Sequence, residues 1–111
     1  MPSDFYCDEV LSGKTAVEKV LETNDVLAFH HTRPFWETHI VVIPKTHVDS
    51  LLTIADERLL VEILEVVRRV AYDVVAKTGA ARVLTNLGDY QDSKHLHFHV
   101  NSGNQIRPDG G

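Results

Sequence analysis

Histidines and apolar residues alternate through residues 95–100, in the order His95, Leu96, His97, Phe98, His99, Val100. Successive side chains of a β-strand point to opposite faces, so this spacing predicts three imidazoles on one face and an apolar face packed on the core. Imidazole is the side chain best suited to attack, to exchange a proton or to bind a metal near neutral pH. The stretch is therefore the first place in this sequence to expect chemistry.

A metal site is one interpretation of the histidines. Residues i and i+4 of an extended strand lie about 13 Å apart, whereas Zn–N bonds are about 2.1 Å long. His95 and His99 would both have to lean inward to share one ion, although His47 or His39 could complete a two-histidine site. The single cysteine, Cys7, provides no Cys-x-x-Cys zinc pair. A required metal is therefore not expected, and a small histidine-ligated metal protein stays an alternative.

Nucleophilic catalysis is the second interpretation. A neutral imidazole attacks phosphorus readily, and the phosphorylated ring is reactive enough for water to cleave it. One histidine of the row would attack while its neighbours hold its tautomer, donate to phosphate oxygens or protonate the leaving group. Adjacent positions on one strand face suit that division of roles better than they suit one shared ion.

The composition is typical of a globular protein, with 43% apolar and 24% charged residues among 111. This length predicts one domain over residues 1–111, with an extended tail at 104–111. The net charge of -5 argues against a binder of nucleic acid polymers, whereas local donors can still hold a small anion. No apolar run is long enough to span a membrane, and residues 1–20 do not resemble a secretory signal. We expect a cytoplasmic protein with a small-molecule partner and no membrane contact.

Two helices are expected. Residues 4–13 predict a short helix capped by Ser3 or Asp4. A long amphipathic helix of about 24 residues is predicted to start from Thr53 as its cap and to stop at Gly79. Its apolar residues at helical spacing are Leu59, Leu60, Ile63, Leu64, Val67, Val70, Ala71 and Val74.

Strands are expected at residues 17–21, 26–30 and 82–86, in addition to the histidine stretch. The β-branched run 39–43 predicts a central strand buried on both faces, preceded by a loop over 31–38. Strands on either side of one long helix predict an α+β domain in which that helix packs on one face of an antiparallel sheet.

The histidine stretch resembles the signature of the histidine triad (HIT) family, His-φ-His-φ-His-φ-φ, in which φ is apolar. Gln91 stands four residues ahead of the signature, as in many members. Residues 25–29, Asp-Val-Leu-Ala-Phe, resemble the family's D-x-L-A-F strand, and residues 34–47 resemble its P-x-x-x-x-H-x-L-V-I-P-K-x-H segment. The long helix and Asn86 also fall where the family places them. The resemblance therefore covers nearly the whole chain.

The resemblance implies an α+β fold with a five-stranded antiparallel sheet, one long helix and a short N-terminal helix. It implies a homodimer in which the sheets of two copies join. It also implies hydrolase or transferase activity at the α-phosphate of a nucleotide conjugate, through a nucleotidyl-histidine intermediate and without a required cofactor. The family branches that cleave phosphoramidates and dinucleoside polyphosphates both stay open.

The resemblance also implies roles for single residues. His97, the middle histidine, matches the family's nucleophile. His95 and His99 match the flanking members that orient the nucleophile and balance its charge. Asn86 and Gln91 match positions that contact ribose or phosphate.

The positions expected around the nucleoside depart in part from the family pattern. Val10 and Phe29 match the apolar wall for the base, but His31 stands where the family commonly has an acid that holds the ribose hydroxyls. Asp92 stands where a Ser or Thr often contacts the phosphate region. A carboxylate there repels phosphate unless it is protonated, turned away or paired with Lys94.

Further departures concern the end of the motif and a metal. Asn101 occupies the last motif position, which is usually apolar. Zinc-binding members carry an N-terminal cysteine pair that Cys7 alone does not provide, although His47 and His95 match the histidine half of that site. The departures leave open a nucleotide-binding regulatory module without turnover as the alternative to an enzyme.

Overall fold

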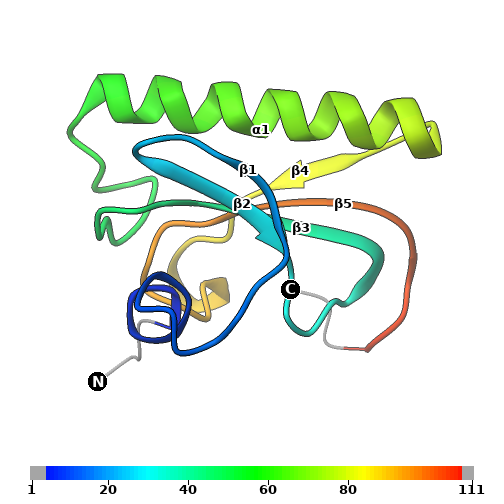
Figure 1. Ribbon diagram of the computed structural model, residues 1–111, viewed down its shortest axis with the longest axis horizontal. Coiled ribbons are helices and arrows are strands. Elements are labelled where there is room, and N and C mark those ends of the chain that lie inside the picture. The colour runs from blue at the N-terminus through cyan, green and yellow to red at the C-terminus, as the bar shows by residue number, and fades with distance from the viewer. Residues whose placement is uncertain (1–4, 109–111) are drawn as a thin grey trace.

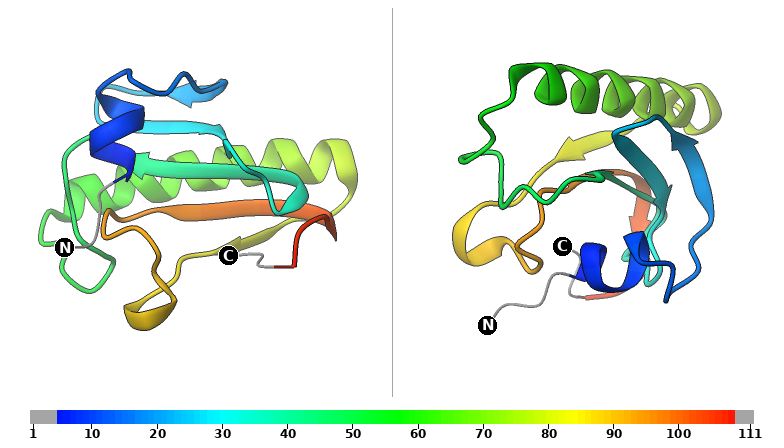
Figure 2. Two further views of the ribbon diagram at one scale, coloured as in Figure 1. Left: turned by 90° about the horizontal axis from the view of Figure 1, so that it is seen from below. Right: turned by 60° about the vertical axis from the view of Figure 1, so that its left-hand side comes forward.

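The computed structural model of the chain describes residues 5–108 (Figure 1). Five antiparallel strands form one sheet in the order β1-β2-β3-β5-β4, and one long helix, α1, crosses a face of it (Figures 1 and 2). The predicted α+β fold is confirmed. The strands are β1 (Lys19–Glu22), β2 (Val26–His30), β3 (Trp36–Pro44), β4 (Arg82–Leu84) and β5 (Phe98–Gln105).

The central strand is β3, as its β-branched sequence predicts. Its residues from His39 to Pro44 are buried, because β2 and β5 flank it and both of its faces are covered. The strand begins at Trp36, because Trp36 and Thr38 pair with the far end of β5 across an irregular step. The prediction of a loop over the whole of 31–38 is therefore wrong for residues 36–38.

Helix α1 spans Glu57–Thr78 and is the predicted long helix with a different cap. The side chain of Asp56 accepts hydrogen bonds from two backbone N–H groups of the first turn, so Asp56 caps the helix and the prediction of Thr53 is wrong. Gly79 ends the helix as predicted, in the left-handed conformation with φ 93°. Among the described residues, no helix is both long and apolar enough to cross a membrane.

One face of the sheet packs against the apolar face of α1. Alternate residues of β2, β3 and β5 meet the helix, because side chains of a strand alternate between faces. Leu64, predicted on the apolar face, is instead 45% exposed. The buried residues of this cluster are Val26, Ala28, Ile40, Val42, Ile63, Val66, Val67, Val70, Val74, Leu96, Phe98 and Val100.

The opposite face of the sheet carries a short π-helix, η1 (Tyr6–Leu11), which is the predicted N-terminal helix (Figure 2). Its predicted capping residues, Ser3 and Asp4, lie outside the described residues. Tyr6 and Val10 are buried against the sheet. Their partners in this second apolar cluster are Leu27, Phe29, Val41 and Ile43.

The histidine stretch enters the sheet later than predicted. β5 begins at Phe98, so His95 and His97 precede it, and the N–H of Leu96 donates to the carbonyl of Val48 at 2.6 Å. The predicted alternation holds, because the apolar residues of the stretch pack with α1 while the histidine rings lie with the η1 face. The three histidines are 0%, 5% and 2% exposed, in chain order, so the face that carries them is covered rather than open.

The other strand ends differ slightly from the predicted ones. The strands predicted at 17–21 and 82–86 are β1 and β4, each shifted or shortened at its ends. The extended tail was predicted to begin at residue 104, but residues 104 and 105 still belong to β5, and Gln105 pairs with Trp36. Residues 109–111 lie outside the described part of the chain.

Candidate active site

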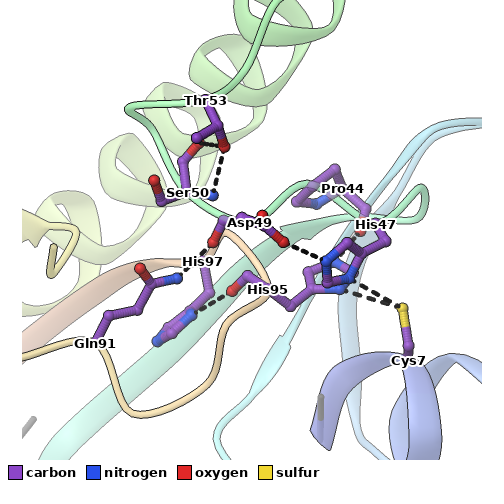
Figure 3. Close-up of polar contacts among 9 residues, drawn as sticks. All are labelled: Cys7, Pro44, His47, Asp49, Ser50, Thr53, Gln91, His95 and His97. Carbon is purple, nitrogen blue, oxygen red and sulfur yellow. Dashed lines mark hydrogen bonds and ion pairs between the residues drawn. The ribbon is translucent and has the colours of Figure 1, made fainter. Parts of the chain in front are cut away.

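His97 has one ring nitrogen tied to the backbone. Its Nδ1 lies 2.7 Å from the carbonyl oxygen of His95 (Figure 3). Because a carbonyl only accepts, Nδ1 carries the proton and Nε2 of the neutral ring carries the lone pair. His97 is 5% exposed, and its ring centroid lies 5.0 Å from that of Tyr6. The arrangement presents Nε2 as a lone-pair donor in a largely covered site.

A second hydrogen-bond chain determines the tautomers of His39 and His99. The backbone N–H of Phe35 donates to Nδ1 of His39 at 3.1 Å, so neutral His39 carries its proton on Nε2. That nitrogen lies 2.8 Å from Nδ1 of His99, which therefore accepts. His99 then carries its proton on Nε2, which is buried and has no hydrogen-bond partner among residues 5–108. A bound acceptor would satisfy this N–H, whose burial alone costs about 1–3 kcal/mol.

His31 extends the same cluster by stacking. Its ring centroid lies 4.4 Å from that of His39 and 6.4 Å from that of His99, with interplanar angles of 31° and 22°. The backbone N–H of Arg33 donates to Nδ1 of His31 at 2.9 Å, so Nε2 of neutral His31 is also an N–H donor. Where the family commonly has an acid, this chain presents a neutral donor.

These imidazoles are neutral at pH 7. Burial, and then repulsion between neighbouring rings, lowers the pKa of His31 and His39 to about 4 and the pKa of His99 to about 3. Burial also lowers the pKa of His97, while its backbone hydrogen bond and the Asp92 carboxylate act in the opposite direction. The cluster therefore offers neutral N–H donors and one nucleophilic lone pair instead of positive charge.

The imidazole of His95 points away from His97. Its Nε2 lies 2.7 Å from the carbonyl oxygen of Pro44, and its Nδ1 lies 3.3 Å from Sγ of Cys7 (Figure 3). The row of three histidines is thus divided between two clusters. The backbone carbonyl of His95, and not its ring, orients His97.

Cys7, His47 and His95 form the other cluster, with one ligand atom from each lying within 4.8 Å of the others (Figure 3). Nε2 of His95 donates to the Pro44 carbonyl, and Nε2 of His47 donates to Oδ1 of Asp49 at 2.6 Å. Both Nδ1 atoms therefore carry lone pairs, at 3.3 Å and 3.9 Å from Sγ of Cys7. Thiolate and imidazole held by such partners are ligands that zinc prefers, so these residues fit a zinc ion.

The two amide side chains expected at the substrate differ in their surroundings. Gln91 is buried, and its Nε2 donates to the carbonyl oxygen of Asp49 at 2.7 Å (Figure 3). Gln91 therefore joins the loop before the histidines to the loop after β3. Asn86 is half-buried, and its side chain forms no hydrogen bond with any other described residue. Of the two, Asn86 has its hydrogen-bonding groups available to a ligand.

Asp92 is exposed, and its carboxylate forms no hydrogen bond or ion pair within residues 5–108. Lys94 is directed elsewhere, because its Nζ donates to the carbonyl oxygens of Gly88 and Gln91 at 2.9 Å and 3.0 Å. The ion pair between Asp92 and Lys94, which the sequence left open, is therefore not formed. The carboxylate nevertheless acts electrostatically on His97.

The expected base wall is present but covered. Val10 and Phe29 are 6% and 1% exposed and belong to one apolar cluster. The ring of Tyr6 lies 6.0 Å from that of Phe29 and also contacts the ring of His97. Tyr6 and Val10 of η1 thus pack against Phe29, and a planar base at this wall would have to displace them.

A cavity of about 660 Å³ borders the cysteine–histidine cluster and lies apart from His97. Its lining comes from the loop after β3 and the start of α1, with His47 and Asp49 among acidic neighbours such as Glu62. Neither His97 nor His99 lines this cavity. The ring of His97 instead contacts Tyr6 of η1.

Several members of the clusters carry no local signal in the sequence. His39 is 60 residues from His99, and Cys7 is 40 and 88 residues from His47 and His95. The sequence offered His39 only as a possible second metal ligand, and it gave Cys7 no partner. Tyr6, which contacts His97, had no sequence signal at all.

The sheet, the single long helix and the histidine row on the opposite face define a protein of the histidine triad class. The HIT domain family matches residues 13–106, and the chain belongs to this family. An uncharacterised 13.2 kDa HIT-like protein of Azospirillum brasilense is 36% identical over 112 residues, which cover 96% of this chain and 91% of that protein.

Solved structures agree with this assignment. A HIT family hydrolase from Legionella pneumophila is 27% identical, with a TM-score of 0.79 over 97% of this chain and 100% of that one. A hypothetical histidine triad nucleotide-binding protein from Sulfolobus tokodaii is 30% identical, with a TM-score of 0.80 over 88% of this chain and 67% of that one. The predicted family is therefore confirmed.

Proposed function

We propose that the protein is a nucleotide hydrolase or transferase that acts at the α-phosphate of a nucleotide conjugate. The observation that carries this proposal is the tautomer of His97, whose Nδ1–H is held by the His95 carbonyl at 2.7 Å while Nε2 keeps the lone pair. The lowered pKa of His97 keeps that lone pair free at neutral pH. Relatives described as a hydrolase and as a nucleotide-binding protein support the same reading.

In the first step, Nε2 of His97 attacks the α-phosphorus. A P–N bond forms, and the bond to the leaving group breaks with its electron pair on the leaving atom, which takes a proton from water. The ring then carries phosphorus on Nε2 and a proton on Nδ1, so it is a cation. The carbonyl of His95 and the carboxylate of Asp92 stabilise that charge.

In the second step, water attacks the phosphorus of the nucleotidyl-histidine. The P–Nε2 bond breaks, its electron pair returns to the ring, and a proton of the water passes to solvent. The product is a nucleoside monophosphate, and an acceptor other than water turns the same step into a transfer.

Neutral donors bind the phosphate in this proposal. The buried Nε2–H of His99, without a partner among the described residues, is assigned to a phosphate oxygen. Fixed donors aimed at developing negative charge lower the barrier of such reactions. We assign Nε2–H of His31 and the amide of Asn86 to the sugar and phosphate, and the wall of Val10 and Phe29 to the base. Phosphoramidates and dinucleoside polyphosphates are both retained as substrates.

A covalent adduct is the test. Wild-type protein is mixed with an adenylated substrate that has a good leaving group, quenched rapidly and examined by intact-protein mass spectrometry. The expected result is an added nucleotidyl mass in the wild type and none in His97→Ala. His30→Ala, a change at an exposed histidine, is the matched control that keeps the adduct. An adduct in His97→Ala would contradict the proposal.

A nucleotide-binding module without turnover is the alternative function. Asp92 and His31 favour it, because both replace residues that contact substrate in the family. This alternative predicts nucleotide binding with no adduct and no released leaving group. The same quench experiment therefore separates the two functions.

The cysteine–histidine cluster is proposed as a structural zinc site. Cys7, His47 and His95 would hold the ion, and Asp49 would orient His47. Bound zinc would tie η1 to the loop after β3 and to the histidine row, and it is given no step in the reaction. Metal analysis of wild type and Cys7→Ala, with melting temperatures before and after chelation, tests the site. Wild-type protein that takes up no zinc would contradict it.

We also propose a homodimer. Four exposed apolar side chains of α1 fall on one helical face. They are Val61 (54% exposed), Leu64 (45%), Tyr72 (74%) and Val75 (45%). The edge strand β4 adds Val83, which is 48% exposed. An unpaired edge strand and an apolar helix face suit pairing with a second copy. Sedimentation should give a dimer for the wild type and a monomer for Leu64→Lys, and a monomeric wild type would contradict the proposal.

We infer a cytoplasmic location. The sequence has one cysteine and therefore no intramolecular disulfide, as is usual in a reducing compartment. The proposed substrates are small nucleotide conjugates. Cell fractionation should recover the protein with cytoplasmic markers, and recovery outside the cell would contradict the inference.

A further inference from the structure

Helix η1 contributes a ring that lies against the candidate nucleophile. The ring centroid of Tyr6 is 5.0 Å from that of His97 and 6.0 Å from that of Phe29. Tyr6 is 6% exposed and His97 is 5% exposed, so neither ring is open to solvent. His97 also contacts the ring of His99, its neighbour in the histidine row, whereas the Tyr6 contact comes from a separate element. Tyr6 is therefore the contact that His97 loses when η1 moves.

The same helix packs on the apolar wall assigned to the base. Tyr6 and Val10 belong to η1, and both are buried in one cluster with Phe29 of β2. A planar base enters beside Phe29 only if both side chains are displaced. A shift of η1 away from the sheet displaces both and uncovers His97 at the same time, which the rotation of one side chain does not achieve. Access to the wall and access to the nucleophile thus depend on the position of η1.

The segment after η1 forms hydrogen bonds back to the helix. The backbone N–H of Gly13 donates to the carbonyl oxygen of Val10 at 3.2 Å, and that of Thr15 donates to the carbonyl oxygen of Glu9 at 2.9 Å. Gly13 has φ 82°, and residues 12–14 are exposed. A glycine in an exposed segment is a point at which a short helix can turn relative to the strand that follows. The segment therefore allows η1 to shift while its own turns stay intact.

Cys7 attaches η1 to the histidine row. Its Sγ lies 3.3 Å from Nδ1 of His95 and 3.9 Å from Nδ1 of His47, the three groups that fit a zinc ion (Figure 3). Consecutive Cα atoms are about 3.8 Å apart, so η1 cannot carry Tyr6 away from His97 without also carrying Cys7 away from the two imidazoles. An ion bound by all three groups opposes that movement, because the movement removes one of its ligands.

We propose that η1 is a cover of the active site that zinc holds closed. Zinc bound by Cys7, His47 and His95 keeps Tyr6 on His97, and loss of the ion lets η1 shift and admits the nucleotide. The two sites are then negatively coupled, so the nucleotide lowers the affinity for zinc by the same factor as zinc lowers the affinity for the nucleotide. The effect on the nucleotide rests on the proposed function and adds regulation to it, whereas the cover itself depends only on the contacts of η1.

The first experiment measures access to His97 with a small reagent instead of a nucleotide. Diethyl pyrocarbonate acylates an imidazole nitrogen that offers an accessible lone pair, and peptide mass spectrometry gives the rate at each histidine. One equivalent of zinc added to the metal-free wild type should slow the acylation of His97 by about tenfold, because η1 then stays on the sheet. His30, an exposed histidine, is the internal control whose rate stays the same.

Two pairs of variants assign the effect to single residues. Cys7→Ala should react at His97 as fast as the metal-free wild type, with or without zinc, whereas Asp8→Asn, a change at the exposed next residue, should keep the zinc response. Tyr6→Ala should react fast at His97 even in the presence of zinc, because the covering ring is removed. Leu11→Ala, a change in the same helix and apolar cluster, should keep the response. Cys7→Ala keeps the Tyr6 ring and so tests the cover independently of that packing.

A second measurement connects the cover to the nucleotide. Calorimetry with adenosine monophosphate, a product of the proposed reaction, should give a dissociation constant about tenfold higher for the zinc-loaded wild type than for the metal-free wild type. Cys7→Ala should give the same constant with and without zinc. In the wild type, adenosine monophosphate should weaken zinc binding by the same factor, which a competing zinc indicator measures.

Failure of this proposal differs from failure of the proposed function. If zinc leaves the acylation of His97 or a measured affinity for adenosine monophosphate unchanged in the wild type, the proposal is overturned, and a nucleotidyl adduct would still support the proposed function. If adenosine monophosphate binds to no form of the protein while the acylation of His97 follows zinc, the proposed function fails and the cover stands. An equal zinc response in Cys7→Ala, or a wild type that takes up no zinc, would overturn the cover.

Discussion

Two imidazole clusters meet where the chain enters β5, and they use their ring nitrogens in opposite ways. In the cluster of His31, His39 and His99, each Nδ1 accepts a hydrogen bond, so the remaining groups are N–H donors. In the cluster of His47, His95 and Cys7, each imidazole Nε2 donates to an oxygen, so the Nδ1 lone pairs are left facing the thiol. The first arrangement suits an anion and the second suits a metal ion.

The difference shows that residue type alone does not decide what a histidine can bind. His95 and His97 are neighbours in one alternating row, yet the ring of His95 lies beside Cys7, whereas the ring of His97 is held by a backbone carbonyl and contacts His99. For His95, His97 and His39 the deciding groups are backbone ones: the carbonyls of Pro44 and His95, and the N–H of Phe35. Each fixes one proton and thereby determines which nitrogen is left for a ligand.

The largest expected effect comes from removing the nucleophile. His97→Gly should lower kcat by about 10³-fold or more, because the covalent route is lost. Free imidazole in the assay should restore part of the activity, since it can occupy the vacated space and attack the same phosphorus. Steady-state kinetics with and without imidazole measures both effects.

The matched variant for this rescue is His99→Gly, which removes a donor and not the nucleophile. Imidazole should rescue it poorly. Equal rescue of both variants would show that the two rings are interchangeable, contrary to the tautomers assigned to them.

A smaller effect is expected from breaking the donor chain. His39→Phe should lower kcat by about 10²-fold, because His99 loses the partner that sets its tautomer. The free energy of unfolding should fall by about 1–3 kcal/mol, since the buried Nδ1 of His99 is left without a hydrogen bond. Kinetics and urea unfolding measure the two changes, and a fully active His39→Phe would remove the chain from the mechanism.

Loss of the zinc ligand Cys7 should change metal binding at the second cluster without disturbing the first cluster. Cys7→Ala should lower zinc content and abolish the fall in melting temperature that chelation produces in the wild type. The hydrogen bond between His39 and His99 should persist in its NMR spectrum, because no side chain is shared between the two clusters. Loss of that bond in Cys7→Ala would show that the clusters are coupled.

Acid should weaken the first cluster. His31 and His39 have pKa values of about 4, and His99 of about 3, all below the ordinary 6.5, so the unfolded chain binds more protons between these values. The free energy of unfolding should therefore fall as the pH decreases from 6.5 towards 4. Denaturant titrations across this range measure the slope, which His39→Phe should reduce. A wild type equally stable at both ends would contradict the lowered pKa values.

The smallest effect is expected from a change outside both clusters. Asp56→Ala removes the cap of α1 and should lower the free energy of unfolding by about 1 kcal/mol. Thr53→Ala, at the position that the sequence suggested as the cap, should cost less. The reverse order in urea unfolding would contradict the assignment of Asp56.

The sequence by itself determined the elements whose signal is local. The alternation of residues 95–100 placed the apolar side chains under α1, and the β-branched run of β3 predicted the central strand. Gly79 predicted the end of α1, because few other residues adopt its left-handed conformation. The histidine motif was also readable, since it depends on spacing within a few residues.

Only the tertiary structure decided the strand ends, the helix cap and the partners of each imidazole. β3 begins early because distant residues of β5 pair with it, and Asp56 rather than Thr53 faces the first N–H groups of α1. Hydrogen bonds that span 60 residues to His99 or 88 residues to His95 leave no mark on local spacing. They depend on which backbone carbonyl or N–H the fold brings to each ring, and that selects the proton positions on which the chemistry depends.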